Sequence, residues 1–129
     1  MGGEPLVSIV IPTYNSARTL TRCLKSVEEQ TLKSYEVIIV DGSSRDRTKE
    51  IALEAVERNP AFKYIETPYR FQAPKRNVGI KASKSEHALF LDSDQYMAPR
   101  LLEKAVEHAE KGGSKRSKSP KSPSPKRAP

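Results

Sequence analysis

Residues 88–94 of this 129-residue chain read ALFLDSD, an apolar run that ends on two aspartates. A buried strand that stops at Asp92 and Asp94 would hold both carboxylates on a rigid support at the edge of a sheet. Strand alternation predicts that both point to the same side, with Ser93 opposite. Two hard oxygen ligands suit Mg²⁺ or Mn²⁺, which bind few protein carboxylates and keep positions for phosphate oxygens. The stretch therefore predicts a divalent-metal site, with a solvated turn as the alternative.

The rest of the chain alternates between strand and helix patterns. Strands rich in apolar residues are expected at residues 7–11, 36–40 and 87–91, and a less buried strand is expected at residues 62–66. Amphipathic helices are expected at residues 17–30, 46–58, 74–83 and 99–111. Pro12 is expected to end the first strand. Continuous apolar strands separated by such helices predict an α/β fold, a mostly parallel sheet with helices on both faces.

Polar segments follow three of the expected strands, at residues 12–15, 41–44 and 92–94. Ligands bind at the carboxyl ends of the strands in sheets of this kind, so these segments are expected at one edge. The Asp41 carboxylate is suited to accept hydrogen bonds from a nucleotide base or a ribose, and the alternative is that it caps the next turn. Backbone amides and the Thr13 hydroxyl would line the base pocket.

The charge of the chain is concentrated near its C-terminus. The net charge is +7, but six of the 23 basic residues lie in residues 115–129, which contain no acidic residue. Residues 1–114 hold the other 17 basic residues against 16 acidic ones, a net charge of +1. The basicity is therefore no evidence for nucleic-acid binding, and no nucleic acid is expected on the folded body.

Residues 114–129 contain only Ser, Lys, Arg, Pro and Ala. Nothing in this composition can bury a core, which predicts one domain at residues 1–112 and a disordered basic tail at residues 113–129. The Ser-Pro pairs of the tail leave phosphorylation, nucleic-acid binding and nuclear targeting open, and a shifted reading frame is the alternative.

The single cysteine, Cys23, excludes an intrachain disulfide and a cysteine-rich zinc site. Its helical spacing from apolar neighbours predicts a buried, inert thiol. The N-terminus lacks the pattern of a signal peptide, and no apolar stretch is long enough to span a bilayer. The expected location is the cytoplasm, with the cytoplasmic face of a membrane as an alternative.

Four motifs together resemble the family 2 glycosyltransferases, which have a GT-A fold. They are VSIVIPTYN at residues 7–15, VDGSSRDRT at 40–48, RNVG at 76–79 and FLDSD at 90–94. They occur in the order and with the spacing of the family over residues 6–97. The resemblance implies a Rossmann-like sheet and transfer of a sugar from a UDP- or GDP-linked donor to an unidentified acceptor, assisted by Mg²⁺ or Mn²⁺.

The resemblance also implies roles for individual residues. It places the nucleotide-sugar contacts on Pro12, Thr13, Tyr14, Asp41, Arg76, Asp92 and Ser93. Among these, Arg76 would lie near the donor phosphates. The metal is assigned to Asp94, the usual contact in the family, together with Asp92.

The chain departs from the family pattern in two respects. The family often has two adjacent aspartates after the second strand, and the second position here is Gly42. Family members also continue well beyond the Asp-x-Asp, into the half that supplies the acceptor pocket and the catalytic base. We therefore expect an incomplete GT-A domain in which the catalytic residues are unknown. Its open sheet edge is expected to associate with a second copy or with a completing partner chain.

Three functions stay open at this point: a transferase, a nucleotide-sugar-binding module without turnover, and an interaction protein that acts through its basic tail. Several smaller expectations concern the same region. Lys75 is expected at the surface, and Gly79 is expected to shape the turn into a helix. Tyr14 is expected either to pack against the base or to cover the sheet edge. Residues 69–71 are expected to form either a donor flap or a plain loop.

Overall fold

The computed structural model describes residues 5–111 and has an α/β fold, as predicted. The sheet in this range has four parallel strands in the order β3-β2-β1-β4: β1 (Val7–Thr13), β2 (Tyr35–Asp41), β3 (Phe62–Glu66) and β4 (Ala88–Phe90). The strands alternate with α1 (Ala17–Glu28), α2 (Thr48–Arg58), α3 (Gln72–Ala82) and α4 (Leu101–Lys111). None of the helices between residues 5 and 111 is long and apolar enough to cross a membrane. The predicted tail lies outside the described residues.

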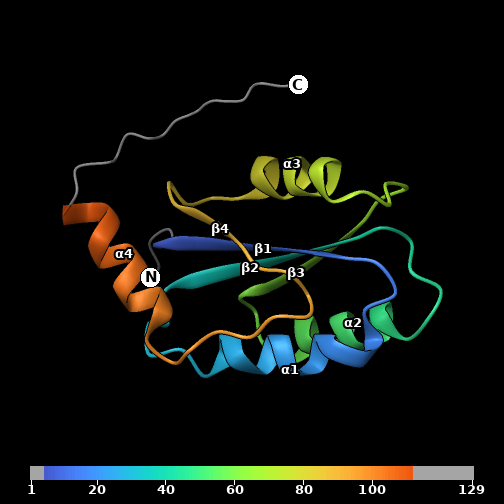
Figure 1. Cartoon of the computed structure of the whole chain (residues 1–129), viewed down its shortest axis with the longest axis horizontal. Coiled ribbons are helices and arrows are strands. Elements are labelled where there is room, and N and C mark those ends of the chain that lie inside the picture. The colour runs from blue at the N-terminus through green and yellow to red at the C-terminus, as the bar shows by residue number, and fades with distance from the viewer. Residues whose placement is uncertain (1–4, 112–129) are drawn as a thin grey trace.

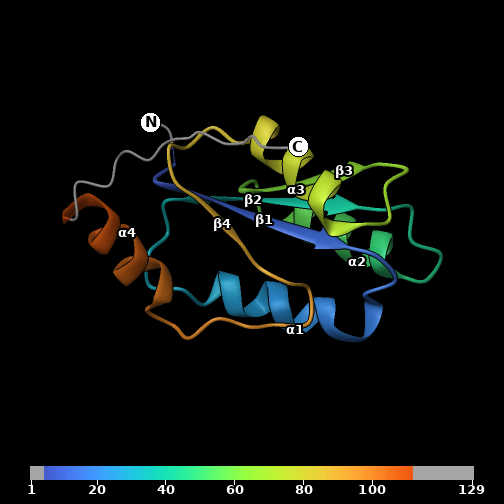
Figure 2. The ribbon, with the colours of Figure 1, turned by 45° about the horizontal axis from the view of Figure 1, so that its top comes forward.

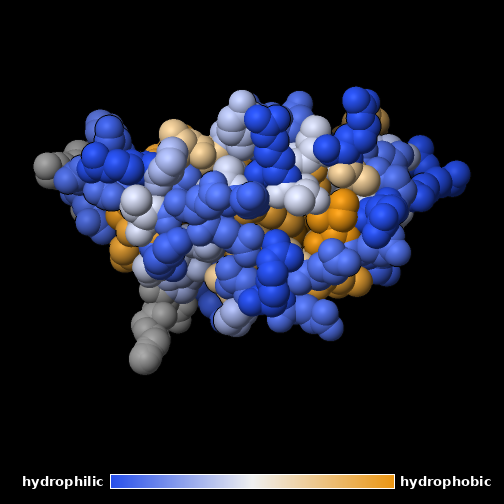
Figure 3. Space-filling view, turned by 90° about the horizontal axis from the view of Figure 1, so that it is seen from below, coloured by the Kyte–Doolittle hydropathy of each residue, from blue (hydrophilic) through white to orange (hydrophobic). Residues whose placement is uncertain are grey.

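The helices cover both faces of the sheet. Helices α1 and α2 lie on one face, α3 lies on the other, and α4 lies beside the amino ends of the strands (Figures 1 and 2). Successive strand residues point to opposite faces, so Ile9 and Ile11 enter the larger core with α1, α2 and α4. Val10 enters a smaller core under α3. Seen from the side of α1 and α2, the surface is mostly hydrophilic, with apolar patches between the polar side chains (Figure 3).

Strand β1 continues through Pro12 to Thr13, so the prediction that Pro12 ends it was wrong. The reason lies in the neighbouring strand. The Ser8 N–H donates to His87 and the Val10 C=O accepts from Leu91, which shows that alternate residues of β1 face β4. Pro12 continues that series beyond the end of β4. Its missing N–H therefore removes no bond from the sheet.

Two helices begin two residues later than predicted, because a polar side chain binds their first backbone amides. The Asp46 carboxylate lies outside α2 and accepts from the Thr48 N–H at 2.9 Å. Gln30, predicted as the end of α1, is buried beyond it, and its side-chain oxygen accepts from the Leu102 N–H in the first turn of α4 at 2.9 Å. Both contacts satisfy donors that a helix start leaves free.

Helix α3 packs on the sheet through a glycine. Gly79 lies in the middle of this helix, within the helix predicted at residues 74–83, so the separate prediction that it shapes the turn into the helix was wrong. It is buried against Val10. A Cβ at Gly79 would lie 2.3 Å from Val10 Cγ1. Ile80 is 40% exposed, because the inward positions of the helix are taken by Lys75, Val78, Gly79 and Ala82.

Helix α1 supports the segment that follows β4. Residues 91–100 run back along α1 toward α4 (Figure 1). The Ser93 hydroxyl donates to Ser16 at 2.8 Å, and the Met97 N–H donates to Ser26 at 3.0 Å. Cys23 is fully buried between these contacts, as predicted. Burial raises the pKa of its thiol to about 12, with smaller contributions from the Asp94 and Asp92 carboxylates.

We expect Gly79→Ala to destabilise the protein. The added methyl group collides with Val10, and overpacking of this kind costs about 1–3 kcal/mol, more than the gain of up to about 1 kcal/mol in helix propensity. Urea unfolding measures the change. Lys81→Ala, at an exposed position of the same helix, is the control and should leave the midpoint nearly unchanged. An alanine variant at residue 79 as stable as the parent would show that the helix shifts away freely.

We expect Cys23 to resist iodoacetamide in the native protein at about pH 8, since its raised pKa leaves almost no thiolate. The neutral thiol contributes to stability below the ordinary pKa of 9.0, and this contribution is lost as the pH rises toward 12. Mass spectrometry with and without urea measures the modification. Rapid alkylation of the folded protein would contradict the buried position.

Candidate functional site

The carboxyl ends of β1, β2 and β4 lie at one edge of the sheet, as predicted. Thr13 at the end of β1 aligns with Asp41 at the end of β2. On the other side of β1, Val10 aligns with Phe90, the last residue of β4. The polar segments that follow these three strands are therefore neighbours, and they form the candidate site together with the first half of α3.

The carboxylate of Asp41 is the centre of a hydrogen-bond network. It accepts from the hydroxyl groups of Thr13 at 2.7 Å, Ser44 at 2.5 Å and Tyr64 at 3.2 Å, and from the Ser44 N–H at 2.9 Å. Burial and then the Asp41 charge raise the pKa of Tyr64, which keeps its hydroxyl a donor. Asp41 is 1% exposed. It caps the turn after β2, and its contact with a nucleotide stays a prediction.

The segments after β1 and β2 are bonded to each other. The Asn15 N–H donates to the Ser44 hydroxyl at 2.7 Å, and the Asn15 side-chain oxygen accepts from the Arg45 N–H at 2.8 Å. Asn15 has a φ of 50° and Ser43 a φ of 60°, left-handed conformations that turn the chain sharply at both exits. The Tyr14 ring is partly exposed at this edge, with the Arg70 guanidinium 5.5 Å from its centroid.

Lys75 is buried in this site, so the prediction of a surface charge was wrong. Its side chain is 2% exposed, and its ammonium donates to the Thr13 C=O at 2.8 Å. The helical spacing of residues 75, 78, 79 and 82 carries the signal, because those four positions form the inward stripe of α3. The hydrophilic character of lysine hides that stripe when the sequence is read for apolar residues. Tyr64 and Ser44, which also contact Asp41, were not predicted as site residues.

Arg76 reaches from α3 to the acidic segment after β4. Its guanidinium lies 3.7 Å from the Asp92 carboxylate, 5.3 Å from the centroid of the Phe90 ring, and donates to Gln72 at 3.1 Å. Its Nε atom is buried without a hydrogen-bond partner among residues 5–111. Arg76, which was predicted to lie near the donor phosphates, is thus held beside Asp92, one of the predicted metal ligands.

A turn positions Asp92 and Asp94, so the prediction from strand alternation was wrong. Strand β4 ends at Phe90, and residues 92–95 form a turn in which the Gln95 N–H donates to the Asp92 C=O at 2.9 Å. Alternation ends with the strand because it depends on extended backbone. The Ser93 side chain is bonded to Ser16 of the segment before α1. Asp92 is partly exposed and Asp94 is exposed.

The two carboxylates fit a cation that needs few protein ligands. The described part of the chain has no group of three or more His, Cys, Asp and Glu side chains that could hold a metal. Mg²⁺ and Mn²⁺ accept one or two carboxylates, with water and phosphate oxygens as the other ligands. Asp94 also borders a hollow of about 470 Å³, whose other lining residues are mainly apolar: Leu89, Phe90, Leu91, Gln95, Tyr96, Met97 and Leu101.

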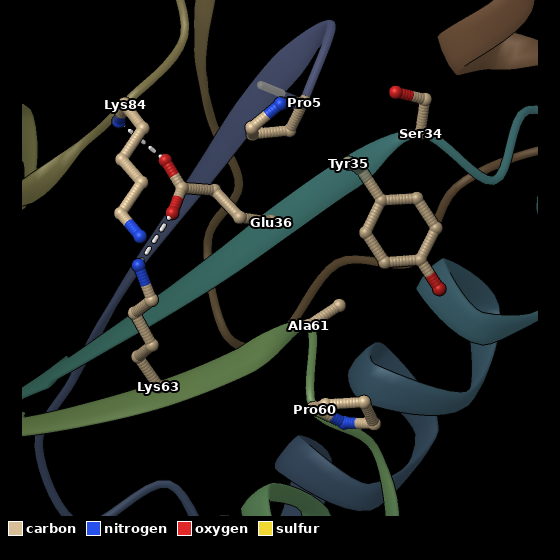
Figure 4. Close-up of a pocket in the computed structure, with 8 residues that line it drawn as sticks. All are labelled: Pro5, Ser34, Tyr35, Glu36, Pro60, Ala61, Lys63 and Lys84. Atoms are coloured by element: carbon tan, nitrogen blue, oxygen red, sulfur yellow. Dashed lines mark hydrogen bonds and ion pairs between the residues drawn. The ribbon is translucent and has the colours of Figure 1, made fainter. Parts of the chain in front are cut away.

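A second hollow, of about 300 Å³, lies at the amino ends of the strands (Figure 4). Its buried Glu36 accepts from Ser8 at 2.6 Å, from Lys63 at 2.9 Å and from the Lys84 N–H. Burial alone would raise the pKa of Glu36, but these hydrogen bonds hold it below its ordinary value. Both carboxylate oxygens are used within the protein, at the end of the sheet opposite the predicted site residues.

Comparison with known proteins agrees with this arrangement. Residues 8–115 match the family described as glycosyl transferase family 2. The chain is 34% identical over 106 residues to the uncharacterized glycosyltransferase EpsJ of Bacillus subtilis, which covers 82% of this chain and 31% of that protein. The chain thus spans about a third of the length of this relative.

Solved structures share the fold. The crystal structure of S. aureus TarS in complex with UDP matches with a TM-score of 0.76 and 29% identity, over 82% of this chain and 32% of that one. The mannosyltransferase PcManGT from Pyrobaculum calidifontis, in complex with GDP-Man and Mn²⁺, matches with a TM-score of 0.76 and 26% identity, over 83% and 33%. The predicted family and the GT-A type of fold are therefore confirmed, and this chain belongs to glycosyl transferase family 2.

Proposed function

We propose that the carboxyl edge of the sheet binds a nucleotide-diphosphate sugar with Mg²⁺ or Mn²⁺, and that the protein transfers the sugar to an acceptor. The observation that carries this proposal is the position of Arg76, 3.7 Å from Asp92 and at the same edge as Asp41. A guanidinium beside an acidic turn can bind phosphate oxygens directly while the carboxylates hold a cation for the others. A diphosphate can use both kinds of contact.

The nucleoside is proposed to lie at the ends of β1 and β2, against Pro12, Thr13, Tyr14 and Asp41. Asp41 already accepts from four groups of the protein, which matches the capacity of a carboxylate. An N–H of the base would therefore replace one of these donors. The Tyr64 hydroxyl is the candidate, because its 3.2 Å contact is the longest of the four.

The metal is proposed to bind Asp94 and Asp92, with Ser93 fixing the turn between them through its bond to Ser16. A divalent ion at this place would neutralise the charge that develops on the diphosphate leaving group. The presence of Mn²⁺ together with GDP-Man in PcManGT supports a divalent ion at the donor site. We retain both UDP and GDP as candidate donor nucleotides, because TarS was solved with UDP and PcManGT with GDP-Man.

Calorimetric titration with UDP, GDP and their sugars, in Mn²⁺ and in EDTA, tests the proposal. We expect binding that requires the metal and that Asp94→Ala weakens by about tenfold or more, because one of the two carboxylates is lost. Arg76→Met should weaken UDP binding by a similar factor but leave the affinity for uridine unchanged. Release of free UDP or GDP from the bound sugar nucleotide then separates a transferase from a binding module.

Glu54→Ala, an exposed carboxylate on α2, is the matched control and should bind as the parent does. A folded sample that binds none of the nucleotides with or without Mn²⁺ would overturn the proposed function. Equal binding by the Asp94→Ala variant would overturn the assignment of the metal.

A nucleotide-sugar-binding module that acts with a partner chain is the second candidate, and the outer edge of β4 favours it. The backbone N–H and C=O groups of residues 87, 89 and 91 point toward β1. Those of Ala88 and Phe90 therefore point away from β1, to the outer edge of the sheet. Phe90 is 43% exposed, and Tyr96 and Leu101 beside it are 61% and 39% exposed. A strand edge that no other strand of residues 5–111 pairs with, and that has apolar neighbours, is suited to pair with another chain.

We expect the protein to self-associate at micromolar concentration through this edge, which sedimentation velocity would measure. Phe90→Lys should return it to a monomer, because a charge at an edge strand opposes pairing. The control is Leu53→Lys, which changes a leucine of α2 that is 42% exposed and should leave association unaltered. A monomeric, cooperatively unfolding parent would remove the support for a partner at β4.

A further inference from the structure

Lys75 is a buried cation that the proposed chemistry does not use. Its neighbours Ala73 and Arg76 on α3 are exposed and partly exposed, whereas Lys75 is 2% exposed. Lysine is almost never fully buried unless it is paired. None of the ion pairs formed within residues 5–111 includes Lys75. A buried ammonium without a carboxylate at contact distance requires another reason to be there.

The contacts of Lys75 join three elements of the candidate site. Its ammonium donates to the Thr13 C=O at 2.8 Å, and the same oxygen accepts from the Gly42 N–H at 3.0 Å. One carbonyl at the end of β1 is therefore held by α3 from one side and by the exit of β2 from the other. The ammonium also lies 5.8 Å from the centroid of the Tyr14 ring.

Thr13 connects Lys75 to the buried carboxylate of Asp41. The Thr13 hydroxyl donates to Asp41 at 2.7 Å, and its carbonyl accepts from Lys75. Burial lowers the pKa of Lys75, while the Asp41 charge opposes that change. The Asp41 charge thus favours the charged form of Lys75, with Thr13 between the two side chains, while the Asp41 oxygens stay bonded to neutral donors.

The space beside Gly42 is filled by the backbone of Tyr69 and the ammonium of Lys75. A Cβ at this position would lie 2.2 Å from the Tyr69 C=O and 3.3 Å from the Lys75 ammonium. A second acidic side chain after Asp41 would therefore have no room in this protein. The Tyr69 carbonyl occupies the place where such a side chain would begin, and the Lys75 ammonium lies next to it, as a fixed charge beside the exit of β2.

We propose that Lys75 is a positioning residue of the donor site, which holds the ends of β1 and β2 at the separation that the nucleotide requires. The inference rests on the proposed function, because the ligand is the donor proposed there. Lys75 acts through Thr13, Tyr14 and the Asp41–Gly42 turn, and it makes no contact with the ligand itself.

Two variants test the proposal. Lys75→Met keeps the volume of the side chain but removes its charge and its hydrogen-bond donor. Lys75→Arg keeps the charge and the donor. Lys81→Met changes an exposed lysine of the same helix and is the matched control. We expect the methionine variant to bind UDP or GDP with Mn²⁺ about tenfold more weakly, and the arginine variant to recover most of that loss. Each titration is made well below the melting temperature of the variant.

Hydrogen exchange of the Gly42 amide gives a readout that needs no ligand. Lys75→Met should speed this exchange relative to the amides in the middle of β2, because the end of β1 is then no longer bonded to α3 and separates from the exit of β2 more often, and Lys81→Met should not. If the parent binds no nucleotide, the proposed function fails, and the exchange result alone decides whether Lys75 holds the strand exits. Unchanged exchange and affinity in Lys75→Met would overturn the inference. Equal weakening in the methionine and arginine variants, in proportion to their lost stability, would reduce Lys75 to a packing residue.

Discussion

The buried carboxylate of Asp41 is the constraint on which the rest of the site depends. A charge removed from water must be matched by hydrogen bonds, and Asp41 takes them from β1, from the turn after β2 and from β3. These bonds fix the exits of β1 and β2 relative to each other and to the middle of β3. The parallel register makes this possible, since it places Thr13 directly opposite Asp41. The same edge then receives α3 with its two cations and the acidic turn after β4.

Most of the fold could be predicted from the sequence because its signals are local. The less buried strand predicted at residues 62–66 matches β3 to the residue, and the helical spacing around Leu20 and Val27 predicts the buried face of α1. Pro12 was misread because its effect depends on where β4 ends, which the residues around Pro12 do not encode. The start of α4 was missed for a similar reason, since its first amides are bonded by Gln30 from a distant part of the chain.

The site was predicted less completely than the fold. The motifs name Asp41, Arg76 and Asp92, and the structure brings these residues to one edge, with Arg76 against Asp92. Lys75 escaped notice because a lysine next to an arginine resembles a solvated pair, and only the packing of α3 on the sheet buries one and leaves the other partly exposed. The orientation of Asp92 and Asp94 likewise depends on a turn that begins where sheet pairing stops.

The segment between β4 and α4 is anchored along the whole length of α1. Ser16, before the helix, and Cys23 and Ser26, within it, bind this segment. The Arg22 guanidinium lies 4.4 Å from the centroid of the Tyr96 ring, and Gln30, beyond the helix, binds the Ala98 C=O. A loop held in this way has lost most of its conformational freedom before any ligand arrives. Binding at its acidic turn would then cost little ordering entropy, and the affinity would be set by the charges rather than by induced order.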